Sequence, residues 1–101
     1  MSTLRFSASA ENDLLDAWLY VAEGSIDAAD HLLEQIEADA RKLLHYPHMG
    51  RLRDELAEGL RCWPGSTPYL VFYFEFAGDI TVARVLHHAR DITALAGWPT
   101  H

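Results

Sequence analysis

The sequence predicts an α+β fold, in which an antiparallel hairpin of two helices packs on a small, mainly antiparallel sheet and a short helix ends the chain. Helical periodicity is confined to the first 45 residues, whereas the clearest strand-like runs follow after position 60. Because helices and strands are segregated rather than alternating, a mainly antiparallel sheet is expected. With 101 residues, 50% of them hydrophobic, the chain is long enough for one domain, residues 1–101, with a single modest core.

The first 22 residues predict a short strand and a helix. Residues 3–7 alternate between polar and apolar side chains, which is typical of a strand. A helix is expected over residues 10–22, after an N-cap at Ser7 or Ser9. Its apolar stripe at helical spacing consists of Leu14, Trp18, Val21 and Ala22.

A second helix is expected over residues 26–45. Gly24 ends the first helix, Ser25 can cap the second, and Pro47 stops it. Its apolar stripe consists of Ala29, Leu33, Ile36, Ala40 and Leu43. Because only a few residues separate the two helices, we expect them to pair in opposite directions.

The remaining elements are predicted to be strands and one short helix. Strands are expected over residues 60–63, 69–76 and 80–87, with a tight turn over residues 77–79 in which Gly78 or Asp79 has a positive φ angle. Residues 48–59 show no clear period beyond a single turn near 54–57. Asp91 can cap the last helix, which spans residues 92–96.

The strand over residues 69–76 is apolar on both faces. One face carries Leu70, Phe72, Phe74 and Phe76, and the other carries Tyr69, Val71 and Tyr73. Because one pair of helices can cover only one face, the other face needs a second cover. The terminal helix with Trp98 can supply it, and so can a partner protein.

Charge is distributed unevenly along the chain, which has a net charge of −7. Residues 1–40 contain one cation, Arg5, against nine carboxylates, whereas residues 41–101 contain seven cations, six of them arginines, against six carboxylates. The first part should repel phosphate and attract a basic partner. We therefore expect no binding of free nucleic acid.

Signals for secretion and membrane insertion are not recognisable in the sequence. Residues 1–13 lack a charged segment followed by an apolar one, and no run reaches about 18 consecutive apolar residues. We therefore expect a cytoplasmic protein without a membrane span. The chain has one cysteine, Cys62, which we interpret as a small apolar strand residue, with a nucleophile paired to a histidine as the alternative.

Two stretches are characteristic enough to suggest a family. They are "YPHMGRLRDEL" followed by "GLR", and "YLVFYF" followed by "DITVARVLHHARD". They occur in this order behind the helical stretches "FSASAENDLLDAWLYVA" and "AADHLLEQIEADARKLL". In this combination, over residues 4–95, the chain resembles the RelE/ParE toxin superfamily, on its ParE-like side.

The resemblance implies the toxin of a bacterial type II toxin–antitoxin system, held inactive by a cognate antitoxin. ParE-like members are associated with inhibition of DNA gyrase, whereas RelE-like members are ribosome-dependent mRNA endoribonucleases. The family fold, a small antiparallel sheet packed by an N-terminal helical hairpin, agrees with the element order derived above. No cofactor is implied.

The residues available for catalysis favour the gyrase branch over the nuclease branch. RNA cleavage without a metal needs groups that move protons and stabilise charge on the phosphate. RelE-like nucleases resemble each other in using lysines, arginines and a tyrosine near the C-terminus, but this chain has one lysine, Lys42, and no tyrosine after Tyr73. If it is a nuclease, the substitute set is Arg61, Arg84, His87 and Arg90.

A toxin that acts by binding needs only docking surfaces. For the target we expect Arg51, Arg53 and Arg61, because the planar guanidinium pairs well with carboxylates in interfaces. For the antitoxin we expect apolar and aromatic side chains, namely Trp18, Tyr69, Val71 and Tyr73.

The stretch "RVLHHARD" at residues 84–91 gathers polar groups at the end of an apolar strand. Arg84 lies among apolar neighbours and therefore needs a buried acceptor. His87 and His88 should point to opposite sides of an extended strand, so we predict no metal site there. We interpret the stretch as an architectural polar network.

Overall fold

The computed structural model describes residues 2–90, 92 and 98, and within them the chain forms two helices and five strands. In chain order the elements are β1 (Leu4–Phe6), α1 (Ala8–Ala22), α2 (Ile26–His45), β2 (Arg51–Leu52), β3 (Arg61–Trp63), β4 (Tyr69–Phe76) and β5 (Asp79–His87). The predicted α+β class is confirmed. The predicted C-terminal helix over 92–96 lies, apart from residue 92, outside the described residues.

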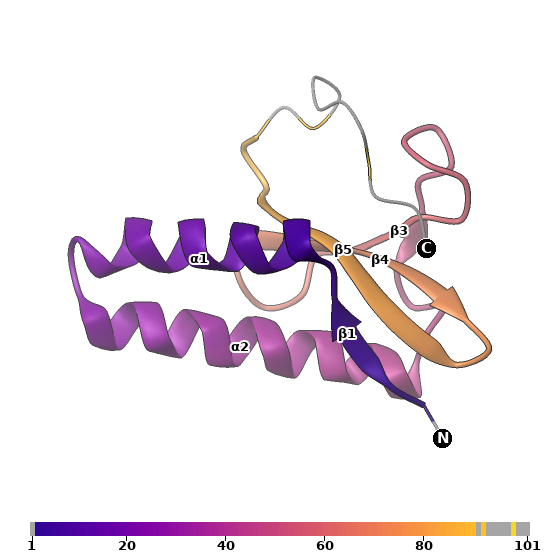
Figure 1. Cartoon of the computed structure of the whole chain (residues 1–101), viewed down its shortest axis with the longest axis horizontal. Helices are drawn as coiled ribbons and strands as arrows, with labels where there is room; N and C mark the ends of the chain where they lie inside the picture. The colour runs from indigo at the N-terminus through magenta and orange to yellow at the C-terminus, as the bar shows by residue number, and fades with distance from the viewer. Residues whose placement is uncertain (1, 91, 93–97, 99–101) are drawn as a thin grey trace.

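Both helices begin at the serine caps that the sequence suggests. The Ser7 hydroxyl accepts the Ala10 N–H at 3.0 Å, and the Ser25 hydroxyl accepts the Ala28 N–H at 3.1 Å. Each cap satisfies one of the N–H groups that a helix leaves unpaired at its start. Figure 1 shows α1 and α2 side by side, running in opposite directions along one face of the sheet.

The inner face of α1 differs from the predicted stripe. Its fully buried residues are Ala10, Asp13 and Ala17, whereas Leu14, Trp18, Val21 and Ala22 are half-buried. Small side chains face inward because α1 packs against both α2 and β5. Larger ones lie outward, so that Leu15 and Leu19 are 54% and 51% exposed.

The strands form one mixed sheet in the order β1-β5-β4-β3-β2. β1 pairs with β5 in parallel, and the other three pairings are antiparallel. The sequence does not predict β2, which has only two residues. In the turn between β4 and β5 the positive φ angles belong to Ala77 at 51° and Gly78 at 86°. Of the two candidates, Gly78 has the predicted positive φ angle, whereas the positive φ angle of Ala77 was not predicted.

The register between β4 and β5 shifts at Phe72 and Tyr73, because their partners on β5 are Arg84 and Val82. Ala83 is the extra residue, so the simple alternation of faces breaks in the middle of β5. Val82 and Val85 consequently both join the core beneath the helices, although they are three residues apart. Ala83 and Leu86 join the core on the opposite face of the sheet.

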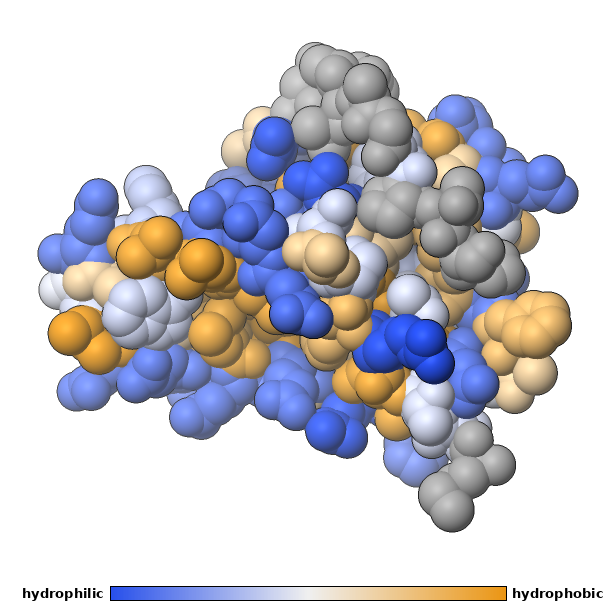
Figure 2. Space-filling model, viewed as in Figure 1, coloured by the Kyte–Doolittle hydropathy of each residue, from blue (hydrophilic) through white to orange (hydrophobic). Residues whose placement is uncertain are grey.

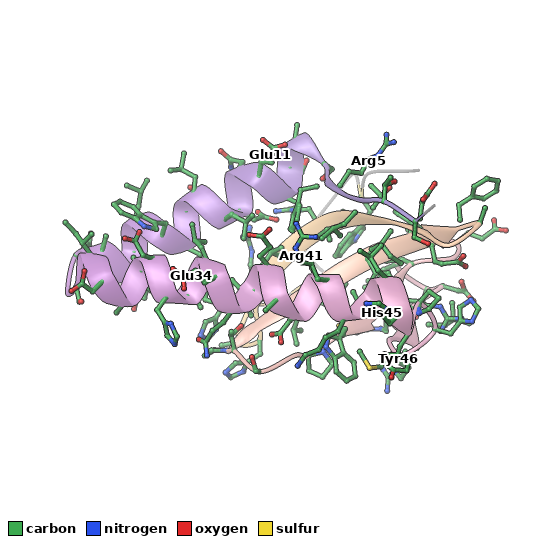
Figure 3. All side chains as sticks on the ribbon, turned by 90° about the horizontal axis from the view of Figure 1, so that it is seen from below. Arg5, Glu11, Glu34, Arg41, His45 and Tyr46 are labelled. Carbon is green, nitrogen blue, oxygen red and sulfur yellow. The ribbon has the colours of Figure 1, made fainter. Side chains whose placement is uncertain are left out.

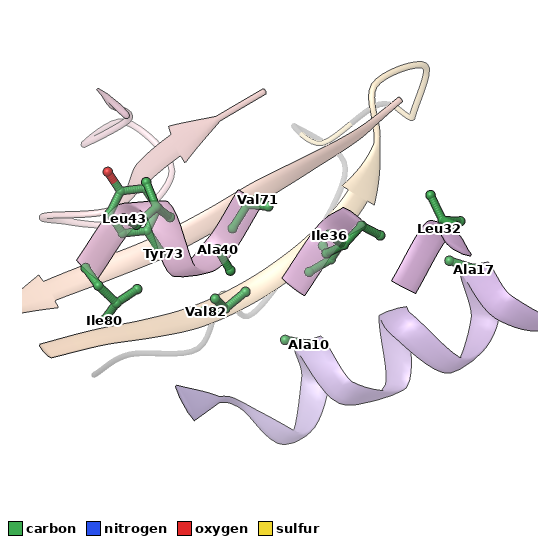
Figure 4. Packing of buried hydrophobic residues seen from close by; sticks show 11 residues of the cluster. Ala10, Ala17, Leu32, Ile36, Ala40, Leu43, Val71, Tyr73, Ile80 and Val82 are labelled. Carbon is green, nitrogen blue, oxygen red and sulfur yellow. The ribbon is translucent and has the colours of Figure 1, made fainter. Parts of the chain in front are cut away.

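The sheet is covered on both faces. Beneath the helices lie Ile36, Ala40 and Leu43 of α2 with Val71 and Tyr73 of β4 (Figure 4). On the other face, Leu60, Phe72 and Phe74 are buried with Leu56, Ile92 and Trp98 packed against them, and the rings of Phe72 and Trp98 lie 5.0 Å apart. Intramolecular packing therefore supplies the second cover that the sequence left open.

No helix within the described part of the chain is long and apolar enough to cross a membrane.

Candidate functional site

Arg84 has the buried acceptor that its surroundings predict. Its Nε and Nη2 donate to the two carboxylate oxygens of Asp13 at 2.7 and 2.9 Å, and the Val85 N–H donates to the same carboxylate at 3.0 Å. The side chains of Arg84 and Asp13 are only 16% and 5% exposed. Hydrogen bonding to the Asp13 carboxylate is the largest cause of the raised pKa of Arg84. The pair joins α1 to β5, as expected for an architectural network.

The three arginines predicted for target binding lie around one edge of the sheet. Arg51 is exposed on β2, opposite Cys62 of β3. Arg53 follows β2, and its Nε donates to Glu55 at 2.6 Å, which lowers the pKa of that carboxyl. Arg61 lies on β3, where its Nη1 donates to the carbonyl of Gly50 at 2.8 Å.

The backbone that carries this edge is held by a buried tyrosine. The Tyr73 hydroxyl donates to the Pro47 carbonyl at 2.8 Å and accepts the Gly50 N–H at 2.9 Å. A side chain on Gly50 would place its Cβ 2.7 Å from the Tyr73 ring, so the close approach depends on glycine. Burial raises the pKa of Tyr73 and of the neighbouring Cys62 thiol, although Arg53 and Arg51 oppose the effect at Cys62. A thiol with a raised pKa is a poor nucleophile at neutral pH.

The four residues of the nuclease alternative do not form one group. Arg61 of β3 lies opposite Tyr73 of β4, whereas His87 of β5 lies opposite Tyr69 of β4. Tyr69 and Tyr73 are four residues apart on β4. That separation is about 13 Å along the strand direction. Arg84 forms an ion pair with Asp13. The Nδ1 atom of His87 accepts a hydrogen bond of 3.1 Å from the Ala89 N–H.

The residues predicted for antitoxin binding divide into buried and accessible ones. Val71 and Tyr73 are 1% and 0% exposed, so their side chains offer no surface to a partner in this fold. Trp18 is half-buried and donates from its indole N–H to Asp30 at 2.8 Å. Tyr69 is half-buried and packs edge to face on His87, with ring centroids 5.3 Å apart.

Two features of the structure were not predicted from the sequence. One is the role of Asp39, a buried carboxylate of α2 that accepts the Ser66 N–H at 2.8 Å and fixes the loop before β4. The other is a pair of hollows around Tyr69 and His87, bounded by α1, by the first half of α2 and by the ends of β4 and β5. Hydrophobic spacing along α1 could have indicated the second, but the residues that complete it come from distant strands.

Among the residues that the structure describes, no three His, Cys, Asp or Glu side chains lie close enough together to hold a metal ion. The rings of His87 and His88 are stacked, with centroids 4.6 Å apart, and do not point to opposite sides as predicted. The strand ends at His87, so the alternation on which that prediction relied does not continue.

Two helices on a five-stranded mixed sheet, with arginines along one edge, form the kind of small domain expected of a RelE/ParE-type toxin. The profile of the family described as "ParE toxin of type II toxin-antitoxin system, parDE" matches residues 4–92. The chain belongs to this ParE toxin family, and the resemblance inferred from the sequence is confirmed.

A solved structure shows the same fold. A chain from the chromosomal ParDE TA system of P. aeruginosa superimposes with a TM-score of 0.71 and 19% sequence identity. The match covers 86% of this chain and 96% of that one. No curated protein matches the chain by sequence.

Proposed function

We propose that this protein is a cytoplasmic toxin that inhibits DNA gyrase by binding to it and that a cognate antitoxin neutralises it. The observation that carries the proposal is the family match over residues 4–92. Inhibition of gyrase is the activity associated with this family. The proposal requires a docking surface rather than a catalytic centre.

We place the gyrase-binding surface at the edge formed by β2 and β3, where Arg51, Arg53 and Arg61 lie. Arg51 and the neighbouring Leu52 are exposed. Tyr46 is 65% exposed near the end of α2 that leads to this edge (Figure 3). Arginine and tyrosine are enriched among the residues that contribute most to protein interfaces, which supports a docking role.

The arrangement of the polar residues gives less support to an endoribonuclease. Arg84 is neutralised by Asp13, and Arg61 lies about 13 Å along the sheet from His87. A catalytic set has to meet at one phosphate, with groups within hydrogen-bond reach of the reacting atoms.

A supercoiling assay with purified gyrase tests the proposal. The wild-type toxin should inhibit supercoiling or trap cleaved DNA, and Arg51→Ala should weaken the effect at unchanged stability. Arg41→Ala is the matched control, since Arg41 is an exposed arginine of α2 whose ion-pair partner among the described residues is Glu37, at 3.1 Å. Cleavage of mRNA on purified ribosomes, with no effect on gyrase, would replace this proposal with the endoribonuclease.

A further inference from the structure

A basic stretch of the chain joins the end of α2 to β2. Residues 42–53 contain Lys42, Arg51 and Arg53 together with two histidines, and they contain no carboxylate. In a chain with a net charge of −7, this stretch concentrates positive charge. The strand order places β2 at one edge of the sheet. A segment that approaches this edge therefore meets a positive potential.

The turn between α2 and β2 holds a hollow of about 440 Å³ with a mostly apolar lining, which consists of Tyr46, Pro47, His48 and Met49. The ring of Tyr46 is an accessible wall, since this residue is 65% exposed. Met49 packs against the core beneath the helices, and the Pro47 carbonyl accepts the Tyr73 hydroxyl at 2.8 Å. Because its backbone is anchored in this way, the hollow is preformed and fits one apolar side chain of a partner.

Arg61 of β3 places a positive charge beside this hollow. Its Nη1 donates to the carbonyl oxygens of His48 and Gly50 at 3.3 and 2.8 Å, so the guanidinium lies against the backbone of the turn. No described residue accepts a hydrogen bond from its Nε or Nη2, so these donors can bind a carboxylate of a partner. Leu52, which is 46% exposed, lies opposite Arg61 on the same face of the sheet and extends the apolar surface.

We propose that this surface binds an acidic segment of gyrase. We call it the basic edge groove, and it consists of the hollow at residues 46–49 with Arg51, Leu52 and Arg61. One apolar side chain of the segment enters the hollow against Tyr46, and a neighbouring aspartate or glutamate pairs with Arg61. Arg51 attracts further carboxylates. The inference rests on the proposed function, because it names the chemistry of the target segment that this edge recognises.

The lining of the hollow favours a protein segment over the phosphates of DNA. A phosphate backbone has no apolar group that could fill the hollow, and binding to DNA relies on several cations that contact phosphates. Here Lys42 and Arg53 are already paired with carboxylates at 3.9 and 2.6 Å. Arg51 is exposed and pairs with no carboxylate among the described residues. Few available cations beside an apolar hollow suit a segment with one apolar anchor and few carboxylates.

Charge also decides between this groove and the apolar surface of α1. Figure 2 shows hydrophobic residues gathered over α1, where Leu15 and Leu19 are exposed, with hydrophilic ones along α2. Residues 1–40, which include all of α1 and most of α2, hold one cation against nine carboxylates. That surface repels an acidic segment, whereas the basic edge groove attracts it.

The affinity of the full chain for purified gyrase, measured without DNA and over a range of salt concentrations, tests the proposal. Tyr46→Ala should weaken binding by about thirtyfold, the effect of a central aromatic anchor. Arg51→Glu should weaken it by about tenfold and reduce its dependence on salt, because a carboxylate there repels the acidic segment.

Two matched control variants should bind gyrase like the wild type. Tyr20→Ala changes a tyrosine of α1 that is 73% exposed, and Arg5→Glu reverses an exposed arginine of β1 at the opposite edge of the sheet. All four variants change exposed residues, so their melting temperatures should stay close to that of the wild type.

A photo-crosslink identifies the bound segment. The photoreactive analogue p-benzoylphenylalanine at position 46 should crosslink to a gyrase peptide that contains aspartate or glutamate, and the analogue at position 20 should not. A crosslinked peptide without a carboxylate would overturn the proposal. So would a loss of affinity in Tyr46→Ala and Arg51→Glu that appears only when DNA is present, because the groove would then bind phosphates.

The outcome for gyrase itself separates this inference from the proposed function. If the wild type binds and inhibits gyrase but neither Tyr46→Ala nor Arg51→Glu changes the affinity, the basic edge groove is not the binding site, and the inhibition of gyrase stands. If the wild type neither binds nor inhibits gyrase, the groove and the proposed function both fall.

Discussion

Replacing Arg84 by alanine should destabilise the protein far more than an ordinary surface change. The substitution removes two of the three hydrogen bonds that the Asp13 carboxylate accepts from described residues, and of these the Val85 N–H remains at 3.0 Å. The Asp13 side chain is 5% exposed, so water cannot readily replace the lost donors. The variant therefore holds a buried carboxylate without its partner charge.

The expected loss can be worked out from this burial. Breaking a fully buried pair by removing one partner costs about 3–5 kcal/mol. Because the Arg84 side chain is 16% exposed, we expect the lower end, about 3 kcal/mol. For a domain of this size, each kcal/mol lowers Tm by about 4–8 °C, so Tm should fall by about 12–24 °C. A domain of ordinary stability, about 5–15 kcal/mol, can remain folded at room temperature after this loss.

Thermal and urea unfolding of the single and double variants measure the effect. Asp13→Asn combined with Arg84→Ala should be more stable than Arg84→Ala alone by about 1–2 kcal/mol, because asparagine still accepts the Val85 N–H without a buried charge. Arg51→Ala, at an exposed position, should stay within about 0.5 kcal/mol of the wild type. An Arg84→Ala protein that melts with the wild type but has lost toxicity would refute the reasoning and make "RVLHHARD" a functional surface.

Three further predictions concern the backbone and acid stability. Ala77→Asn should raise the free energy of unfolding, measured in urea, by up to about 1 kcal/mol, because alanine is strained at its φ of 51° and asparagine tolerates that angle. Equal or lower stability would contradict this. Gly50→Ala should cost about 1–3 kcal/mol, since its Cβ would lie 2.7 Å from the Tyr73 ring, and a wild-type Tm would disprove the tight packing. A hydrogen bond from the Gly78 N–H is the largest cause, and one with His48 the second, of a pKa of Glu75 below its ordinary 4.5. The ionised Glu75 therefore stabilises the fold, and this stability is lost as the pH falls through the lowered pKa. Melting curves between pH 6 and 3 should show a smaller loss for Glu75→Gln than for the wild type, and equal losses would show that Glu75 is not involved.

The elements predicted best from the sequence are those with local signals. The helix caps at Ser7 and Ser25, the end of α2 before Pro47 and the long strands all follow from a few neighbouring residues. β2 has only two residues and is defined by pairing with β3, so it has no periodicity of its own.

The sequence predicted which kind of partner some side chains need, but not which residue supplies it. The apolar neighbours of Arg84 indicate that it needs an acceptor, but Asp13 lies 71 residues away in the chain. The sequence shows equally well that the strand over 69–76 is apolar on both faces, and it leaves open whether the chain itself or a partner covers them. Only packing shows that Val71 and Tyr73 face the helices and that Trp98 reaches Phe72.

The sequence by itself determined the fold class, the caps, the uneven charge and the resemblance to the toxin family, because each depends on residue types and short spacings. The tertiary structure decided which side chains are exposed, because a single extra residue in β5 shifts the faces that follow it. It also decided where the hollows around Tyr69 and His87 lie, because they exist only where α1 and α2 meet the ends of strands that are distant in the chain.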